Sequence, residues 1–294
     1  MKIIRFLLLG ILITFFSCRG DESQDSGRSI SVSILPQKYF IEQIAGEHFN
    51  VNVLVPPGAN PVSYDPSPKQ MRRLSNSEAY LKIGYLAFEK VWLPKIRSIN
   101  PDLKILDQSL NVDLIKSTGH IHGIHTHSHN DNGIDPHIWT SPRSVKKQIK
   151  TIYRYLIELD PEHSVFYRKN YLLFSQKLDS LDVYISESFK GLEDKTFMIY
   201  HPSLSYLARD YDLKQVSVEM EGKEPSTTKL KEMMDIAKKH DINTVFIQEQ
   251  FSTHSAKAIA RELNAKVVTI NPLEYTWLEG MKDITDKLAQ SMRK

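Results

Sequence analysis

The chain has 294 residues, with 38 Lys and Arg against 35 Asp and Glu, giving a formal net charge of +3. Charges of both signs are interspersed and no basic stripe alternates with aromatic residues, so the sequence argues against a nucleic-acid partner. A single cysteine excludes a disulfide framework within the chain, so stability must come from packed cores. The length allows two lobes of ordinary domain size, roughly 100 to 150 residues each.

Residues 1–17 have the pattern of a secretory signal, because Lys2 and Arg5 precede a short apolar run at 6–16. This run is shorter than the roughly 20 residues that a transmembrane helix needs. Cys18 follows Ser17 at the expected cleavage point, which predicts acylation and an exported protein anchored to a bacterial membrane, on its periplasmic or cell-surface side. A chance cysteine after a plain signal peptide is the alternative. Residues 18–29, rich in Gly, Ser and Asp, are expected to form a flexible tether.

Residues 30–145 alternate short apolar runs with amphipathic stretches, which predicts an N-terminal α/β lobe. Expected strands cover 31–35, 51–55, 79–83 and 104–106, and expected helices cover 37–45, 69–76 and 88–97. This alternation indicates a mostly parallel sheet with helices on its faces.

The strand signal disappears in residues 146–193, which are predicted to be connecting helices. After Asp160 and Pro161, which suit a helix start, apolar residues repeat at helical spacing as far as about Phe189. A helix of about 30 residues would span about 45 Å, long enough to link two lobes rigidly.

Residues 194–294 return to the alternating pattern and predict a C-terminal α/β lobe. Expected strands cover 197–200, 215–218, 244–248 and 266–270, and expected helices cover 204–211, 227–240, 254–264 and 278–292. The predicted fold class is therefore α/β, with two lobes that each hold a mostly parallel sheet flanked by helices. One long rigid helix joins the lobes, and a cleft lies between them.

The histidines are concentrated in one segment, 119–133, which is rich in glycine and has no apolar period. Imidazole binds zinc, copper and nickel, so a flexible tract of this kind predicts an auxiliary, low-affinity metal collector. A solubilising low-complexity loop is the alternative. The histidines concerned are His120, His122, His125, His127 and His129.

Two other histidines lie in constrained places, His137 in the segment Asp135-Pro136-His137-Ile138-Trp139 and His201 directly after an expected strand. Ligands of open parallel sheets bind just beyond the carboxyl ends of the strands, which favours His201. The histidine-rich segment beside His137 adds to this, so both are predicted metal ligands, with a hydrogen-bonded structural histidine as the alternative at each position. Other polar residues share that position after their own strands, namely Glu219, Glu221, Gln248, Glu249, Gln250 and Asn271. Four histidines near element boundaries are interpreted as structural: His48, His163, His240 and His254.

Together these residues resemble the zinc- and manganese-binding solute-binding proteins of metal ABC importers (the cluster A-I family). The likeness covers essentially the whole chain and rests on the order of short motifs. These are ILPQKYF at 34–40, VPPG at 55–58, YDPSP at 64–68, IG at 83–84, DPHIW at 135–139 and EGKEPS at 221–226, with the segments 201–211 and 248–252.

The resemblance implies a metal cleft in which His137 and His201 are two of four ligands. It also implies a spine helix that limits lobe motion, and a membrane permease with its ATPase as partners. The histidine-rich loop is typical of zinc-type members, so Zn²⁺ is the expected ion, with Mn²⁺ or another divalent ion as the alternative. A monomer is expected.

Two positions depart from the family pattern. Val62 stands where the family has His, and Asn271 stands where it has Asp, so the latter offers only a neutral carbonyl oxygen to the metal. We predict Glu249 as the replacement carboxylate; a histidine of the 120–129 loop or a water molecule is the alternative. Tyr64, Gln37, Glu219 and Glu221 are expected to orient ligands rather than bind the ion.

The predicted function is the capture of a divalent ion, zinc before others, and its delivery to an ABC importer without catalysis. A zinc hydrolase is the enzyme alternative, since three ligands plus water is a catalytic pattern and Glu249 could act as a base. No His-Glu-x-x-His or Gly-x-Ser-x-Gly motif supports it. A surface adhesin of the same fold, or a binder of another ion or of a metal chelate, is the remaining alternative.

Overall fold

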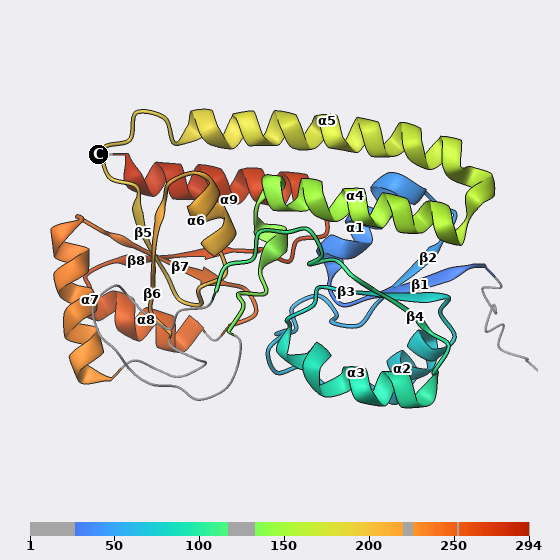
Figure 1. Cartoon of the computed structure of the whole chain (residues 1–294). Helices are drawn as coiled ribbons and strands as arrows, with labels where there is room; N and C mark the ends of the chain where they lie inside the picture. The colour runs from blue at the N-terminus through green and yellow to red at the C-terminus, as the bar shows by residue number, and fades with distance from the viewer. Residues whose placement is uncertain (1–26, 117–132, 220–225, 252, 294) are drawn as a thin grey trace, which may run out of the picture.

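The computed structural model describes residues 27–116, 133–219, 226–251 and 253–293 (Figure 1). The predicted signal, Cys18, most of the tether, the five loop histidines and Glu221 lie outside these residues. Within them, no helix is long and apolar enough to cross a membrane.

The N-terminal lobe is built on a four-stranded parallel sheet in the order β2-β1-β3-β4. Its strands are β1 (Ser29–Val32), β2 (Asn50–Val53), β3 (Ala79–Lys82) and β4 (Lys104–Asp107). Helices α2 (Pro68–Ser75) and α3 (Ala87–Ile99) cover one face of the sheet, and α1 (Leu35–Ala45) lies on the other (Figure 1). The alternation of apolar runs therefore predicted the elements correctly, with ends shifted by a few residues.

The C-terminal lobe repeats this plan with the strand order β6-β5-β7-β8, again parallel throughout. Strands β7 (Thr244–Gln248) and β8 (Lys266–Ile270) have the bounds expected from the sequence. The other elements are β5 (Thr196–Ile199), β6 (Lys214–Ser217), α6 (Ser205–Asp210), α7 (Thr227–Lys239), α8 (Thr253–Glu262) and α9 (Trp277–Met292).

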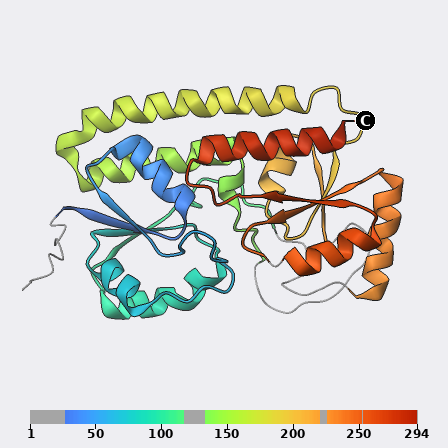
Figure 2. The ribbon, with the colours of Figure 1, turned by 180° about the vertical axis from the view of Figure 1, so that it is seen from behind.

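Two antiparallel helices connect the lobes, α4 (Pro142–Leu159) and α5 (Ser164–Ser188), with one 3-10 turn before α4 (η1, Ile138–Thr140) and one between the two helices (η2, Pro161–His163). Helix α5 runs along both lobes and packs on α1 of one and α9 of the other (Figures 1 and 2). It has 25 residues rather than about 30, because the chain first turns at Asp160 and through η2. The prediction of one long link between two lobes is confirmed.

The hydrophobic core is continuous across the junction of the lobes. Phe40 of α1 packs edge-on against Trp277 of α9, with ring centroids 5.2 Å apart, and lies 6.1 Å from Phe174 of α5. All three side chains are buried in the same cluster. Because core side chains are close-packed, this contact restricts rotation of one lobe against the other.

A glycine at the carboxyl end of β3 shapes the edge of the N-terminal sheet. Gly84 has φ +118°, a conformation that side chains rarely adopt, and its N–H donates to the buried carboxylate of Glu89 at 2.8 Å. An added Cβ would lie 2.7 Å from Oδ1 of Asp107 and 2.9 Å from Oγ of Ser109.

We expect Gly84→Ala to lower the free energy of unfolding by about 2–4 kcal/mol, because backbone strain and a clash combine. Urea denaturation measures the change. Gly191→Ala is the matched control, since Gly191 also has positive φ (+74°) but no atom within 4 Å of an added Cβ. That variant should lose only about 1 kcal/mol. An equal decrease in the free energy of unfolding in the two variants would show that no steric clash contributes at Gly84.

Candidate metal centre

His137 is fixed by the segment that precedes η1. Oδ1 of Asp135 accepts hydrogen bonds from the backbone N–H of His137 at 2.9 Å and from its ring Nδ1 at 2.8 Å. Burial alone would raise the pKa of Asp135, but the charge and hydrogen bonds of His137 outweigh it and hold that pKa below its usual range. The carboxylate is therefore ionised, and it favours the neutral tautomer of His137 that donates through Nδ1 and carries its lone pair on Nε2.

The same segment is anchored to the C-terminal lobe by two tryptophans. Nε1 of Trp139 donates to the carbonyl of Pro272, and Nε1 of Trp277 donates to the carbonyl of Trp139, both at 2.9 Å. Both indoles are buried. His137 is thus positioned by elements of both lobes.

His201 lies just beyond β5, at the point where the strand order of the C-terminal sheet reverses. Nε2 of Gln248, at the end of the neighbouring β7, donates to the carbonyl of His201 at 2.6 Å. The carboxylate oxygens of Glu219 lie 3.3 and 3.4 Å from Nδ1 of His201. Glu219 thus lies where a group that orients a ligand is expected.

The electrostatic surroundings favour a neutral His201. Burial lowers its pKa, and the neighbouring His137 adds to this effect, while Glu219 opposes it. Only 15% of the His201 side chain is exposed, and its ring stacks on Phe251 with centroids 4.8 Å apart. A neutral imidazole is the form that binds metal ions.

The two rings present the same nitrogen to one another, with 3.3 Å between Nε2 of His137 and Nε2 of His201. Two ligands of a tetrahedral zinc ion, at about 2.0–2.1 Å each, are about 3.3–3.4 Å apart. The spacing of the pair therefore fits an ion bound by both rings. The structure brings these two predicted ligands together across a large separation in sequence.

A pocket of ≈ 530 Å³ lies between the carboxyl edges of the two sheets and holds the other two predicted ligands. Glu249, which is exposed, follows β7, and Asn271 follows β8. Oδ1 of Asn271 already accepts from Nε2 of Gln250 at 3.1 Å and from the N–H of Leu273 at 3.0 Å. The lining residues are Ile34, Leu35, Lys38, Val55, Pro56, Pro57, Gly58, Glu249, Gln250, Asn271, Leu273, Glu274 and Tyr275.

Within the described ranges, the histidine pair has no third partner at ligand distance. Among the residues that the structure describes, no other His, Cys, Asp or Glu forms a group with His137 and His201 whose ligand atoms all lie within 4.8 Å. Binding by Glu249 and Asn271 therefore stays a prediction, and for Glu249 it requires movement of its exposed side chain.

Gln37 and Tyr64, two of the residues expected to orient ligands, are hydrogen-bonded elsewhere. The Gln37 amide accepts from the N–H groups of Ser33 and Ile34 and donates to the carbonyl of Leu81. The Tyr64 hydroxyl donates to Oε1 of Gln70 at 2.7 Å. Sequence reasoning missed the role of Asp135, although an acidic residue two positions before a candidate ligand was a usable signal.

Two α/β lobes joined by a rigid helix, with a pair of oriented histidines between them, are the architecture that the resemblance to metal-binding solute-binding proteins implied. The sequence profile of the family "zinc-uptake complex component A, periplasmic" (ZnuA) matches residues 30–291, and the chain belongs to this family.

Curated relatives and solved structures agree with this assignment. The zinc-binding lipoprotein AdcA of Streptococcus pneumoniae R6 is 30% identical over 96% of this chain and 57% of its own length, so the chain spans a little over half of that relative. The high-affinity zinc uptake system protein ZnuA of Bacillus subtilis 168 is 27% identical over 92% of this chain and 88% of its own.

A crystal structure of ZnuA matches with a TM-score of 0.83 and 38% identity, over 91% of this chain and 100% of that one. The laminin-binding protein Lmb of Streptococcus agalactiae, described as bifunctional with adhesin and metal transporting activity, matches with a TM-score of 0.79 and 25% identity over the same shares.

Proposed function

We propose that this protein captures a zinc ion between His137 and His201 and delivers it to an ABC permease that works with an ATPase. The observation that carries the proposal is the 3.3 Å spacing of the two Nε2 atoms, each on a ring whose Nδ1 faces a carboxylate. The zinc-binding names of the relatives and a zinc-bound ZnuA deletion mutant with a TM-score of 0.83 support the same cargo.

Charge balance also supports zinc at this pair. Two neutral imidazoles leave the 2+ charge of the ion uncompensated, but Asp135 and Glu219 place two carboxylates directly behind the rings. Carboxylate–histidine–zinc arrangements raise the basicity of the imidazole and fix its tautomer. Glu249, a loop histidine or water would complete the coordination shell.

The proposed location follows from the leader sequence and from the lipoprotein relatives. Signal cleavage before Cys18 and acylation of its thiol would tether a monomeric protein to the outer side of a bacterial membrane. The role is binding and release without catalysis. Adhesion is a second candidate, favoured by the structural likeness to Lmb. Binding to laminin that persists after zinc is stripped would identify it.

Competition with a chromogenic zinc chelator tests the proposed cargo. We expect one zinc ion per chain to be withdrawn from the chelator with submicromolar affinity, and further zinc to bind more weakly. Mn²⁺ should compete poorly, because imidazole ligands favour zinc over manganese. Failure to withdraw any zinc from the chelator would contradict the proposal.

Zinc affinity should fall at least about tenfold between pH 7.5 and pH 5.5, because protons compete with the ion for the imidazoles. Burial lowers the pKa of His201, so this ring stays neutral until the pH falls below the ordinary histidine value of about 6.5. Most of the loss should therefore occur at the acidic end of the range. Calorimetric titration across this range measures it, and an unchanged affinity would argue against histidine ligation.

A further inference from the structure

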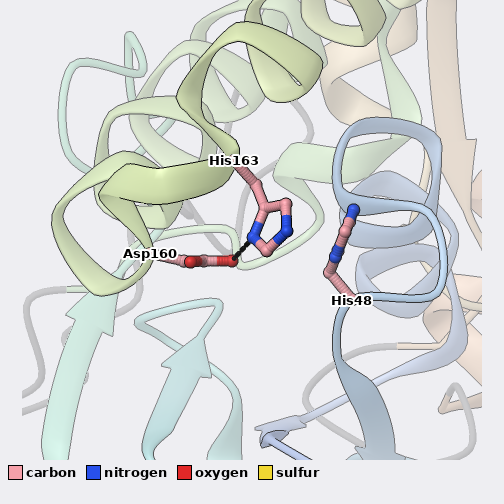
Figure 3. Close-up of side chains that lie close together, drawn as sticks. All are labelled: His48, Asp160 and His163. Atoms are coloured by element: carbon pink, nitrogen blue, oxygen red, sulfur yellow. Dashed lines mark hydrogen bonds and ion pairs between the residues drawn. The ribbon is translucent and has the colours of Figure 1, made fainter.

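A second pair of histidines lies at the opposite edge of the N-terminal lobe from the pocket. His48 lies in the turn that precedes β2, at the amino edge of the sheet, and His163 ends η2 at the corner between α4 and α5 (Figure 3). Their ring centroids are 3.9 Å apart with an angle of 37° between the planes. One ligand of the pair thus comes from the lobe and the other from the connecting helices.

A buried carboxylate orients one of these rings. Asp160 is 5% exposed, and its Oδ2 accepts from Nδ1 of His163 at 2.8 Å and from the hydroxyl of Tyr167. Its Oδ1 lies 3.1 Å from Nη1 of Arg28. Because Nδ1 of His163 donates to Asp160, Nε2 carries the lone pair, and Figure 3 shows this nitrogen on the side of the ring toward His48. The pairing repeats that of Asp135 with His137.

The spacing and the exposure of the cluster suit an ion that arrives from solvent. A ligand atom from each of His48, Asp160 and His163 lies within 4.8 Å of the other two. Ligand atoms of one tetrahedral zinc ion are about 3.3–3.4 Å apart, so any pair that is wider than this must close up when an ion binds. Rotation of the imidazoles can supply this movement, since the His163 side chain is 43% exposed and His48 is partly exposed.

We propose that His48 and His163 form a second binding site for a divalent transition ion, separate from the cargo site, with Asp160 as the positioning carboxylate. Paired imidazoles select zinc, nickel or copper over magnesium and calcium, and water would complete the shell. Asp160 positions rather than binds, because three donors already occupy its oxygens. An ion held here would link the α1–β2 turn to the α4–α5 corner, and binding to the folded form alone would stabilise it.

The experiment begins from a background chain in which the other proposed sites are removed. His137→Ala and His201→Ala abolish the cargo pair, and the five loop histidines at 120, 122, 125, 127 and 129 are replaced by asparagine. Titration with Zn²⁺ by calorimetry should then show one residual ion per chain, bound more weakly than the cargo. Zinc should also raise the thermal unfolding midpoint of this chain. If the background binds no zinc up to millimolar concentration, the proposal is wrong.

Added to the background, His48→Gln or His163→Gln should each weaken the residual binding at least about tenfold and remove the thermal shift. His240→Gln is the matched control, because His240 also pairs through Nδ1 with a carboxylate, Asp194 at 2.7 Å, but has no described histidine beside it. Its binding should stay within about twofold of the background. Equal weakening in all three variants, or in none, would overturn the proposal.

Thermal unfolding of each variant in the presence of EDTA shows whether the metal-free chain is folded. If either substitution prevents folding, a second measurement on the background chain replaces it. Cu²⁺ added at one equivalent to the background chain should give an electron paramagnetic resonance spectrum with coupling to two imidazole nitrogens. A spectrum without nitrogen coupling would overturn the proposal. This site is tested independently of the cargo site, because the cargo histidines are absent throughout.

Discussion

Replacing both His137 and His201 with alanine is expected to abolish tight zinc binding. Zinc bound by four ligands with a total of about 10–16 kcal/mol gains about 3 kcal/mol per ligand, so two lost ligands correspond to a loss of roughly 10⁴-fold in affinity. The structure gives no substitute at the same place, since no third described ligand atom lies close to both rings. Calorimetric zinc titration of the wild type and the variant measures the difference.

Two further variants distinguish the contribution of His137 and His201 from that of the other histidines. Deletion of residues 120–129 should leave tight zinc binding in place. His240→Ala should also leave the zinc affinity unchanged, since His240 pairs with Asp194 away from His137 and His201. Retention of tight binding in the double alanine variant would contradict the assignment of the pair. Loss of tight binding on loop deletion would show instead that the loop supplies the dominant ligands.

Removing the charge behind each ring should weaken zinc binding about 10- to 100-fold while the rings themselves remain. Asp135→Asn removes the ionised acceptor that holds Nδ1 of His137 at 2.8 Å, and Glu219→Gln does the same beside His201. An amide can present a donor to the ring, which favours the tautomer with its proton on the metal-binding nitrogen. Zinc titration of each variant, at pH 7.5, measures the effect.

The control for both carboxylates is Asp194→Asn, because Asp194 accepts from a histidine in the same way at 2.7 Å but outside the cleft. Its zinc affinity should equal that of the wild type. Thermal unfolding without zinc separates lost ligand orientation from lost stability. Unchanged affinity in both Asp135→Asn and Glu219→Gln would contradict the view that these carboxylates balance the charge of the ion.

Much of the fold could be predicted from the sequence, because the strand period of about 2 residues and the helix period of about 3.6 residues are both visible within a short stretch of chain. Strands β7 and β8 are short apolar runs between clear helix signals, and their bounds agree with the expected ranges. The start of α5 was placed too early, because Pro161 suits a helix start but here opens a 3-10 turn. Helix ends depend on packing and capping that a periodic pattern does not carry.

The site was only partly predictable for a related reason. The rule that ligands bind beyond strand ends identified His201, and the constrained segment around Pro136 identified His137. Their approach to 3.3 Å depends on how the two lobes are docked, which the Trp139 and Trp277 hydrogen bonds decide. The same limit explains why His48 and His163 were interpreted separately as structural, since they lie far apart in sequence and meet only through the α4–α5 corner.

Anomalous X-ray diffraction at the zinc edge tests the central claim most directly, using crystals of the protein with one equivalent of zinc. We expect one dominant anomalous peak within about 2.0–2.1 Å of Nε2 of both His137 and His201. The occupants of the remaining coordination positions would identify the group that replaces the ligands lost at Val62 and Asn271. A dominant peak elsewhere, with no zinc between these two rings, would contradict the account.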